Sequence, residues 1–329
     1  MAAVHTAARQ ARVRAGFFFA AAFVGVLGLG GCISLPQSEA LRASPPPDLP
    51  PRVELTEVPF HPQDREFLCG PAALATVIGA AGVPADIESM TPLVYLPGRR
   101  GSLQAEMLGA TRRSGLVAYT LAPQLEAVLR EIAAGTPVVV LVNLTFRLMP
   151  VWHYAVVVGY DLERERIVVR TGPIKRDEFR LGFFEFLWRD SEHWSMVALA
   201  PGRMPATARE QEFAAAVAAL EQAGHSREAR ESYRALLQRW PSNLVGLIGL
   251  GNVEYALKDL PASERAFRRA SEAHPQSGPA FNNLAHALAE LGRLAEAEAA
   301  GRTAVALGGP TLAEAQKTLE AILARRATR

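Results

Sequence analysis

Residues 63–78 read QDREFLCGPAALATVI, and this stretch decides the fold. After Cys69, small and apolar side chains recur at the spacing of an α-helix. Pro71 suits the first turn of a helix, and Gly82 and Pro84 are expected to end it. The pattern therefore predicts a helix that begins at Cys69, with the sulfur close to free backbone N–H groups. The positive end of the helix dipole favours the thiolate form of a cysteine in that place.

A cysteine at a helix start is either a small buried residue or a reactive thiol, and the sequence downstream bears on that choice. Strand patterns cover residues 137–142, 153–160, 167–170 and 194–200. Helical patterns cover about 103–114 and 123–134. The fold class predicted for this part of the chain is therefore α+β, an N-terminal helix followed by an antiparallel sheet.

A cysteine box followed by a histidine box resembles the papain-like cysteine peptidases, in particular the bacteriocin-processing peptidases that cut after double-glycine leaders. The resemblance covers roughly residues 58–200. The CGPA run at 69–72 is similar to the family's nucleophile box. Gln63 lies six residues before the cysteine, where the family has its oxyanion-hole glutamine, and His153 opens the strand HYAVVVGY. We therefore expect a papain-like domain over residues 58–202.

The resemblance implies a site for nucleophilic catalysis on peptide bonds. Cys69 would be the nucleophile, and His153 would take its proton and later protonate the leaving amine. Gln63 and the backbone N–H of Cys69 would hold the oxyanion. No metal or cofactor is expected, because His61 and His193 have no partner at ligand spacing.

The aspartate that orients the histidine in this family has no direct counterpart. The matching position falls nearest Thr171, whose hydroxyl can accept a hydrogen bond but carries no charge. Asp161 lies eight residues past His153, too far along an extended strand, and Asp177 is the other alternative. A papain-like domain of weak or no activity, which only binds peptide, is therefore the second hypothesis.

The C-terminal part has an internal period of 34 residues, because Trp240-Pro241 and His274-Pro275 are separated by that number. The period aligns further large and small positions: Phe213, Leu247 and Phe281; Ala216, Leu250 and Leu284; Leu236, Ala270 and Ala304. This resembles tetratricopeptide repeats, all-α solenoids of paired helices. Over residues 207–329 we expect such repeats, with 311–326 as a capping helix, a less well packed helix at Gly301, and a protein partner on one face. A generic helical bundle is the alternative.

The N-terminus resembles a bacterial lipoprotein signal. Arg9, Arg12 and Arg14 precede an apolar run over residues 15–30, which ends in Leu29-Gly30-Gly31-Cys32. This predicts removal of residues 1–31 and lipidation of Cys32, and Ile33 favours the outer membrane, facing the periplasm. An uncleaved anchor helix is the alternative. Residues 32–57 are predicted to be a proline-rich tether.

Overall charge narrows the functional class. The 329 residues carry 35 basic and 33 acidic side chains, so nothing indicates nucleic-acid binding, and Arg99-Arg100 is interpreted as solvated surface. The leading hypothesis is a lipid-anchored envelope cysteine peptidase whose repeats hold a protein partner. A lipid-anchored peptide-binding adaptor is the alternative.

Overall fold

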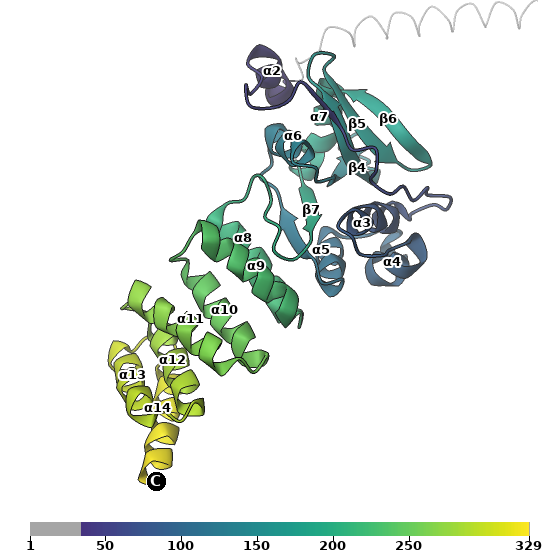
Figure 1. Ribbon diagram of the computed structural model, residues 1–329. Coiled ribbons are helices and arrows are strands. Elements are labelled where there is room, and N and C mark those ends of the chain that lie inside the picture. The colour runs from purple at the N-terminus through teal and green to yellow at the C-terminus, as the bar shows by residue number, and fades with distance from the viewer. Residues whose placement is uncertain (1–33, 329) are drawn as a thin grey trace, which may run out of the picture.

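The computed structural model describes residues 34–328, which form an α+β domain followed by a run of helices (Figure 1). Its sheet has the order β2-β7-β3-β4-β5-β6, all antiparallel, and β1 pairs with β4. The strands are β1 (Arg52–Glu54), β2 (Val117–Thr120), β3 (Val138–Asn143), β4 (Trp152–Asp161), β5 (Arg166–Thr171), β6 (Ile174–Arg180) and β7 (Ser195–Leu199).

Helices cover both faces of this sheet. One face packs against α3 (Cys69–Ala80), α4 (Ile87–Val94) and α5 (Gln104–Arg113). The other face packs against α2 (Pro36–Ala43), α6 (Leu125–Ala133) and α7 (Leu181–Trp188). Because strand side chains alternate, Val140 and Val142 enter one core, and Val139 and Leu141 enter the other. The central strand β3 is consequently buried along its whole length.

The predicted α+β fold class is confirmed, and the four predicted strands correspond to β3, β4, β5 and β7. The strands β1, β2 and β6 were not predicted. β6 reads IKRDEFR and lies at the edge of the sheet, where its mostly exposed side chains leave no apolar run in the sequence. β1 has only three residues and β2 four, too few to show a period.

The prediction of an extended tether is wrong for the described part of residues 32–57. Residues 36–43 form α2, which packs on the α+β domain, with Leu41 buried in its core. The backbone N–H groups of Gln37 and Ser38 donate to the Glu185 carboxylate at 3.0 and 2.7 Å. Pro36 is compatible with the first turn of a helix, and Glu185 satisfies N–H groups that a short helix leaves free. Residues 1–31 and Cys32 lie outside the described residues.

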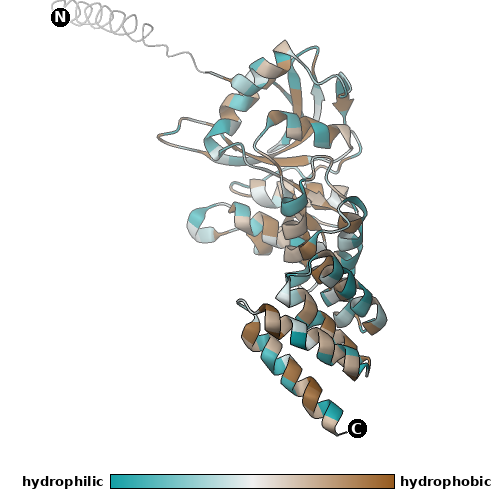
Figure 2. Ribbon diagram, turned by 90° about the vertical axis from the view of Figure 1, so that its left-hand side faces the viewer, coloured by the Kyte–Doolittle hydropathy of each residue, from teal (hydrophilic) through white to brown (hydrophobic). Residues whose placement is uncertain are grey.

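The C-terminal helices pair as tetratricopeptide repeats do, and this prediction is confirmed. Figure 2 shows hydrophobic and hydrophilic residues alternating along them, as amphipathic packing requires. The helices are α8 (Glu210–Gln222), α9 (Ser226–Arg239), α10 (Leu244–Ala256), α11 (Leu260–Ala273), α12 (Gly278–Glu290), α13 (Leu294–Leu307) and α14 (Leu312–Ala327).

Gly301 does not loosen the third repeat, contrary to expectation. It is buried in α13 beneath α14, and a Cβ at this position would lie 3.3 Å from Leu319 Cδ1. The missing side chain therefore lets the capping helix approach α13 closely. In the part of the chain that the structure describes, no helix is both long and apolar enough to cross a membrane.

The first repeat shares a hydrophobic core with the α+β domain. Phe213 of α8 lies edge-on to Tyr119 of β2, with ring centroids 6.3 Å apart. The buried Glu131 of α6 accepts hydrogen bonds from the backbone N–H of Ala206 at 3.2 Å and of Thr207 at 2.9 Å. The Thr207 hydroxyl also donates to Glu131, at 2.7 Å. The two regions are thus packed together rather than joined by a free linker.

Candidate active site

Cys69 is the first residue of α3, with the following helical turns buried under the sheet. Burial raises the pKa of the Cys69 thiol, and this outweighs the opposite effect of the backbone N–H groups of Tyr154, Gly70 and Cys69 itself. The N–H groups at the helix start thus favour the thiolate, as expected, but burial has the larger effect, and the net pKa of Cys69 is raised. Loss of hydration destabilises the thiolate more than the hydrogen bonds from the nearby N–H groups stabilise it.

His153 lies on β4, and its ring Nε2 is 2.8 Å from the Thr171 hydroxyl oxygen at the end of β5. Burial lowers the pKa of the His153 imidazole, so the ring is neutral near pH 7. In the neutral tautomer whose Nε2–H donates to Thr171, the lone pair of Nδ1 accepts a proton. The structure thus places a hydroxyl, and not a carboxylate, on Nε2 of the imidazole.

The two alternative aspartates have other contacts. Asp161 lies at the far end of β4, opposite Arg166 of β5 in the sheet register. Its carboxylate accepts a hydrogen bond from the backbone N–H of Arg164 at 2.9 Å. The Asp177 carboxylate accepts the backbone N–H of Glu178 at 2.9 Å, on the edge strand β6. The hydrogen-bond partner of His153 is therefore Thr171 and neither aspartate.

Gln63 is held on the same end of β5. Its backbone N–H donates to the Gly172 carbonyl at 3.1 Å, and its side-chain Nε2 donates to the Arg65 carbonyl at 2.9 Å. An amide nitrogen has two N–H groups, so one remains for a ligand. Gln63 and Cys69 line the same hollow.

Arg170 is a positioning residue that the sequence analysis missed. Its side chain is buried in the sheet and donates to the backbone carbonyls of Thr56, at 3.3 Å, and of Val58 and Pro59. These contacts fix the segment that leads to Gln63. The consecutive residues Arg170, Thr171 and Gly172 therefore hold both the glutamine segment and the histidine ring. A lone arginine in the run IVVR carries no signal of this role, because its partners are distant main-chain atoms.

A cleft of about 560 Å³ opens over Cys69 and His153. Its walls come from three segments: the approach to α3, the turn around the 3₁₀ helix Pro97–Arg99, and the start of β4. The lining residues are Gln63, Glu66, Phe67, Cys69, Arg99, Arg100, Gly101, Ser102, Leu103, Pro150, Val151, Trp152, His153 and Tyr154. Within residues 34–328, no cluster of three or more His, Cys, Asp or Glu side chains could hold a metal ion.

Alkylation of Cys69 by iodoacetamide is expected to become about tenfold faster per pH unit from about pH 6 to 8, without a plateau. The reason is that the raised thiol pKa keeps the thiolate fraction small over this range, and each pH unit multiplies it. Mass spectrometry of the Cys32→Ser variant measures the labelling of Cys69 alone. A rate that is flat from about pH 6 upward would show a thiolate–imidazolium pair and contradict the prediction.

Comparison with known proteins agrees with the two-part organisation. Residues 55–191 match the family model described as Peptidase_C39 like family, and residues 213–277 and 248–310 match that of the tetratricopeptide repeat. No curated protein matches the chain.

Solved structures that are similar include the translocator chaperone SycD of Yersinia enterocolitica and PcrH of Pseudomonas aeruginosa. SycD is 20% identical, covers 36% of this chain and 85% of its own, and has a TM-score of 0.34. PcrH is 22% identical, covers 35% of this chain and 91% of its own, and has a TM-score of 0.33.

Proposed function

Because the chain joins a Peptidase_C39-like domain to tetratricopeptide repeats, we propose that it is a lipid-anchored cysteine peptidase of the bacterial cell envelope. The observation that carries the proposal is the convergence of Cys69, His153 and Gln63 on one cleft. Thr171 on the far nitrogen of the imidazole leaves the other nitrogen to act as a base. The cleft is large enough for several residues of an extended peptide.

The reaction begins with a neutral thiol and a neutral imidazole. As the sulfur attacks the scissile carbonyl carbon, its proton passes to Nδ1 of His153 and the carbonyl electrons move to oxygen. The free N–H of Gln63 and the N–H of Cys69 stabilise that oxyanion. Collapse breaks the C–N bond, and His153 protonates the leaving amine. Water, deprotonated by His153, then hydrolyses the thioester and the sulfur regains its proton.

A second candidate function is a peptide-binding adaptor with weak or no hydrolysis. It is favoured by the raised pKa of Cys69 and the lowered pKa of His153, which both oppose charge separation. It is also favoured by Thr171, which cannot stabilise the imidazolium by charge as an aspartate does. The two functions share the cleft and differ in whether a peptide leaves it cut.

The experiment that separates them is incubation of the purified chain with a random peptide pool, followed by mass spectrometry of new amino termini. Hydrolysis at a recurring sequence supports the peptidase. Peptides that are retained by the protein and recovered uncut support the adaptor.

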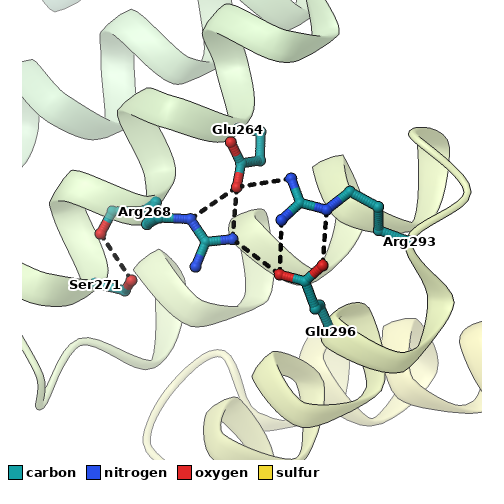
Figure 3. Close-up of polar contacts among 5 residues, drawn as sticks. All are labelled: Glu264, Arg268, Ser271, Arg293 and Glu296. Carbon is teal, nitrogen blue, oxygen red and sulfur yellow. Dashed lines mark hydrogen bonds and ion pairs between the residues drawn. The ribbon is translucent and has the colours of Figure 1, made fainter.

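We also propose that the repeats hold a protein partner in the groove between α11 and α13. This groove, of about 370 Å³, has an apolar floor that includes Phe281 and Leu284. Arg268 and Glu296, which line the groove, belong to a charged network drawn in Figure 3. In it, Glu264 contacts Arg268 at 2.6 Å and Arg293 at 3.3 Å. Glu296 closes the network with Arg293 at 2.6 Å and Arg268 at 3.4 Å. Because these charges neutralise one another, the apolar floor is expected to supply most of the binding energy.

Anchoring through Cys32 predicts that the wild-type chain, expressed in a Gram-negative bacterium, partitions into the membrane fraction. Two or more acyl chains give stable membrane attachment, whereas a protein without them stays in the aqueous phase. The mature wild-type chain is therefore expected to begin at Cys32 and to carry acyl mass there, whereas the Cys32→Ser variant keeps residues 1–31 and carries none; intact mass spectrometry measures both. A membrane-bound wild-type chain that keeps residues 1–31 and carries no acyl mass would favour an uncleaved anchor helix instead.

A further inference from the structure

Two non-glycine residues with left-handed backbone conformations meet at the rim of the cleft. Phe67, two residues before Cys69, has φ of 65°, and Arg100 has φ of 48°. The Arg100 guanidinium lies over the Phe67 ring, with its carbon 5.9 Å from the ring centroid. Such conformations cost free energy and are concentrated at functional sites. Both segments thus have strained backbone conformations where they place an aromatic ring and a cation on the wall of the cleft that Cys69 also lines.

The two arginines of this rim have no carboxylate partner. Among residues 34–328, neither the Arg99 nor the Arg100 side chain forms an ion pair or a hydrogen bond, whereas Arg176 contacts both Glu54 and Glu178 at 2.7 Å. Glu66 is the cleft's only carboxylate among its described lining residues. The rim is therefore positively charged, with guanidinium N–H groups available to an incoming group.

The same cleft exposes large apolar side chains. Phe67 is 40% exposed, Val151 51% and Trp152 45%, and all three line the cleft. Exposed apolar groups that gather around a concave site indicate a surface that becomes covered by a ligand. An apolar wall beside a cationic rim is complementary to a ligand that carries both an apolar group and a negative charge.

We propose that the cleft selects peptides that carry an acidic side chain beside a bulky apolar residue near the bond over Cys69. The carboxylate would accept two parallel N–H groups from Arg100 or Arg99, the strongest geometry for this pair. The apolar residue would pack on Phe67 and Trp152. The inference rests on the proposed function for the place of the peptide, and its charge preference can be measured without cleavage.

The test uses the full chain with Cys69→Ala, immobilised, and three pools of nonapeptides that are N-acetylated and C-terminally amidated. Each pool has Glu, Gln or Lys at the central position and uncharged residues elsewhere. We expect the Glu pool to be retained about tenfold better than the Gln pool, with the Lys pool weakest, because a charged acceptor is replaced by a neutral or repelling group. A Gln pool with a free C-terminal carboxylate tests whether the carboxylate at a chain end binds the arginines as well as an acidic side chain does.

Charge reversal supplies the specificity control. Adding Arg99→Glu and Arg100→Glu is expected to reverse the preference toward the Lys pool, and Arg99→Gln with Arg100→Gln to abolish it. Arg227→Glu, an exposed position on α9 in the repeats, should leave it unchanged. A thermal melt checks that each variant is folded.

Several outcomes would overturn the inference: equal retention of the three pools, retention of none, a preference that survives the reversal, or equal retention of the free-carboxylate Gln pool. Cleavage by the wild-type chain is scored separately. Absence of cleavage with the Glu preference intact would refute the peptidase and leave this inference standing, whereas cleavage without a charge preference would do the reverse.

Discussion

Replacement of Cys69 by alanine is expected to lower the rate of peptide hydrolysis by about 10⁴-fold or more, to background. The methyl group cannot form the thioester, and His153 then has no nucleophile to deprotonate. His153→Ala should cause a loss of similar size, because residues that act as a unit do not contribute independently. The rate of appearance of new amino termini from a peptide pool measures both.

Thr171→Val is expected to lower the rate of hydrolysis less than the replacement of Cys69 or His153. It removes the hydroxyl 2.8 Å from Nε2 of His153 while keeping the side-chain volume. We expect a loss of about tenfold to a hundredfold, because one neutral hydrogen bond orients the ring less strongly than a charge. All variants should unfold at nearly the wild-type temperature. Cleavage that survives in folded Cys69→Ala at a tenth of the wild-type rate or more would contradict the thiol mechanism.

The largest effect on stability is expected from Glu131→Ala. The buried carboxylate accepts three hydrogen bonds from Ala206 and Thr207, at the start of the repeats. Its removal leaves those donors without a partner and creates a cavity next to α6. We expect the free energy of unfolding to fall by about 3 kcal/mol. The midpoint of urea unfolding, followed by the near-ultraviolet signal of the tryptophans, measures it.

Glu126→Ala is the matched control for that variant. Glu126 lies on the same helix and pairs with Arg130 at 2.8 Å on the surface, so its loss should cost under about 0.5 kcal/mol. Limited proteolysis should also cut Glu131→Ala faster between residues 200 and 209. If Glu131→Ala and Glu126→Ala unfold at the same urea concentration, Glu131 does not connect the two regions.

The periodicity of apolar side chains along the sequence was sufficient to predict the elements whose structure depends on neighbouring residues. The helix at Cys69 and the strand at His153 follow from side-chain period, and the 34-residue repeat follows from its large and small positions. The edge strand β6 and the helix α2 did not follow. α2 depends on Glu185, which is 147 residues away from Ser38 in the chain, and no local pattern records such a partner.

The candidate site shows the same division. Cys69, His153 and Gln63 were selected from spacing and resemblance, and the position next to His153 was assigned to Thr171. The raised pKa of Cys69 was not predicted, because it results from burial beneath elements far apart in the chain. The roles of Arg170 and of the Arg99–Arg100 rim were missed for the same reason: each depends on what lies opposite in space.

The core shared by Tyr119 and Phe213 has a consequence for substrate choice. Because the first repeat is packed on the α+β domain, the groove of the repeats and the sulfur of Cys69 belong to one packed body. A protein gripped in the groove would reach the sulfur only if its docking segment and its scissile bond are separated by enough residues to bridge the distance from the groove to the sulfur. If the proposed peptidase activity is present, it would then discriminate among proteins by the spacing between two of their segments as well as by the residues next to the cut.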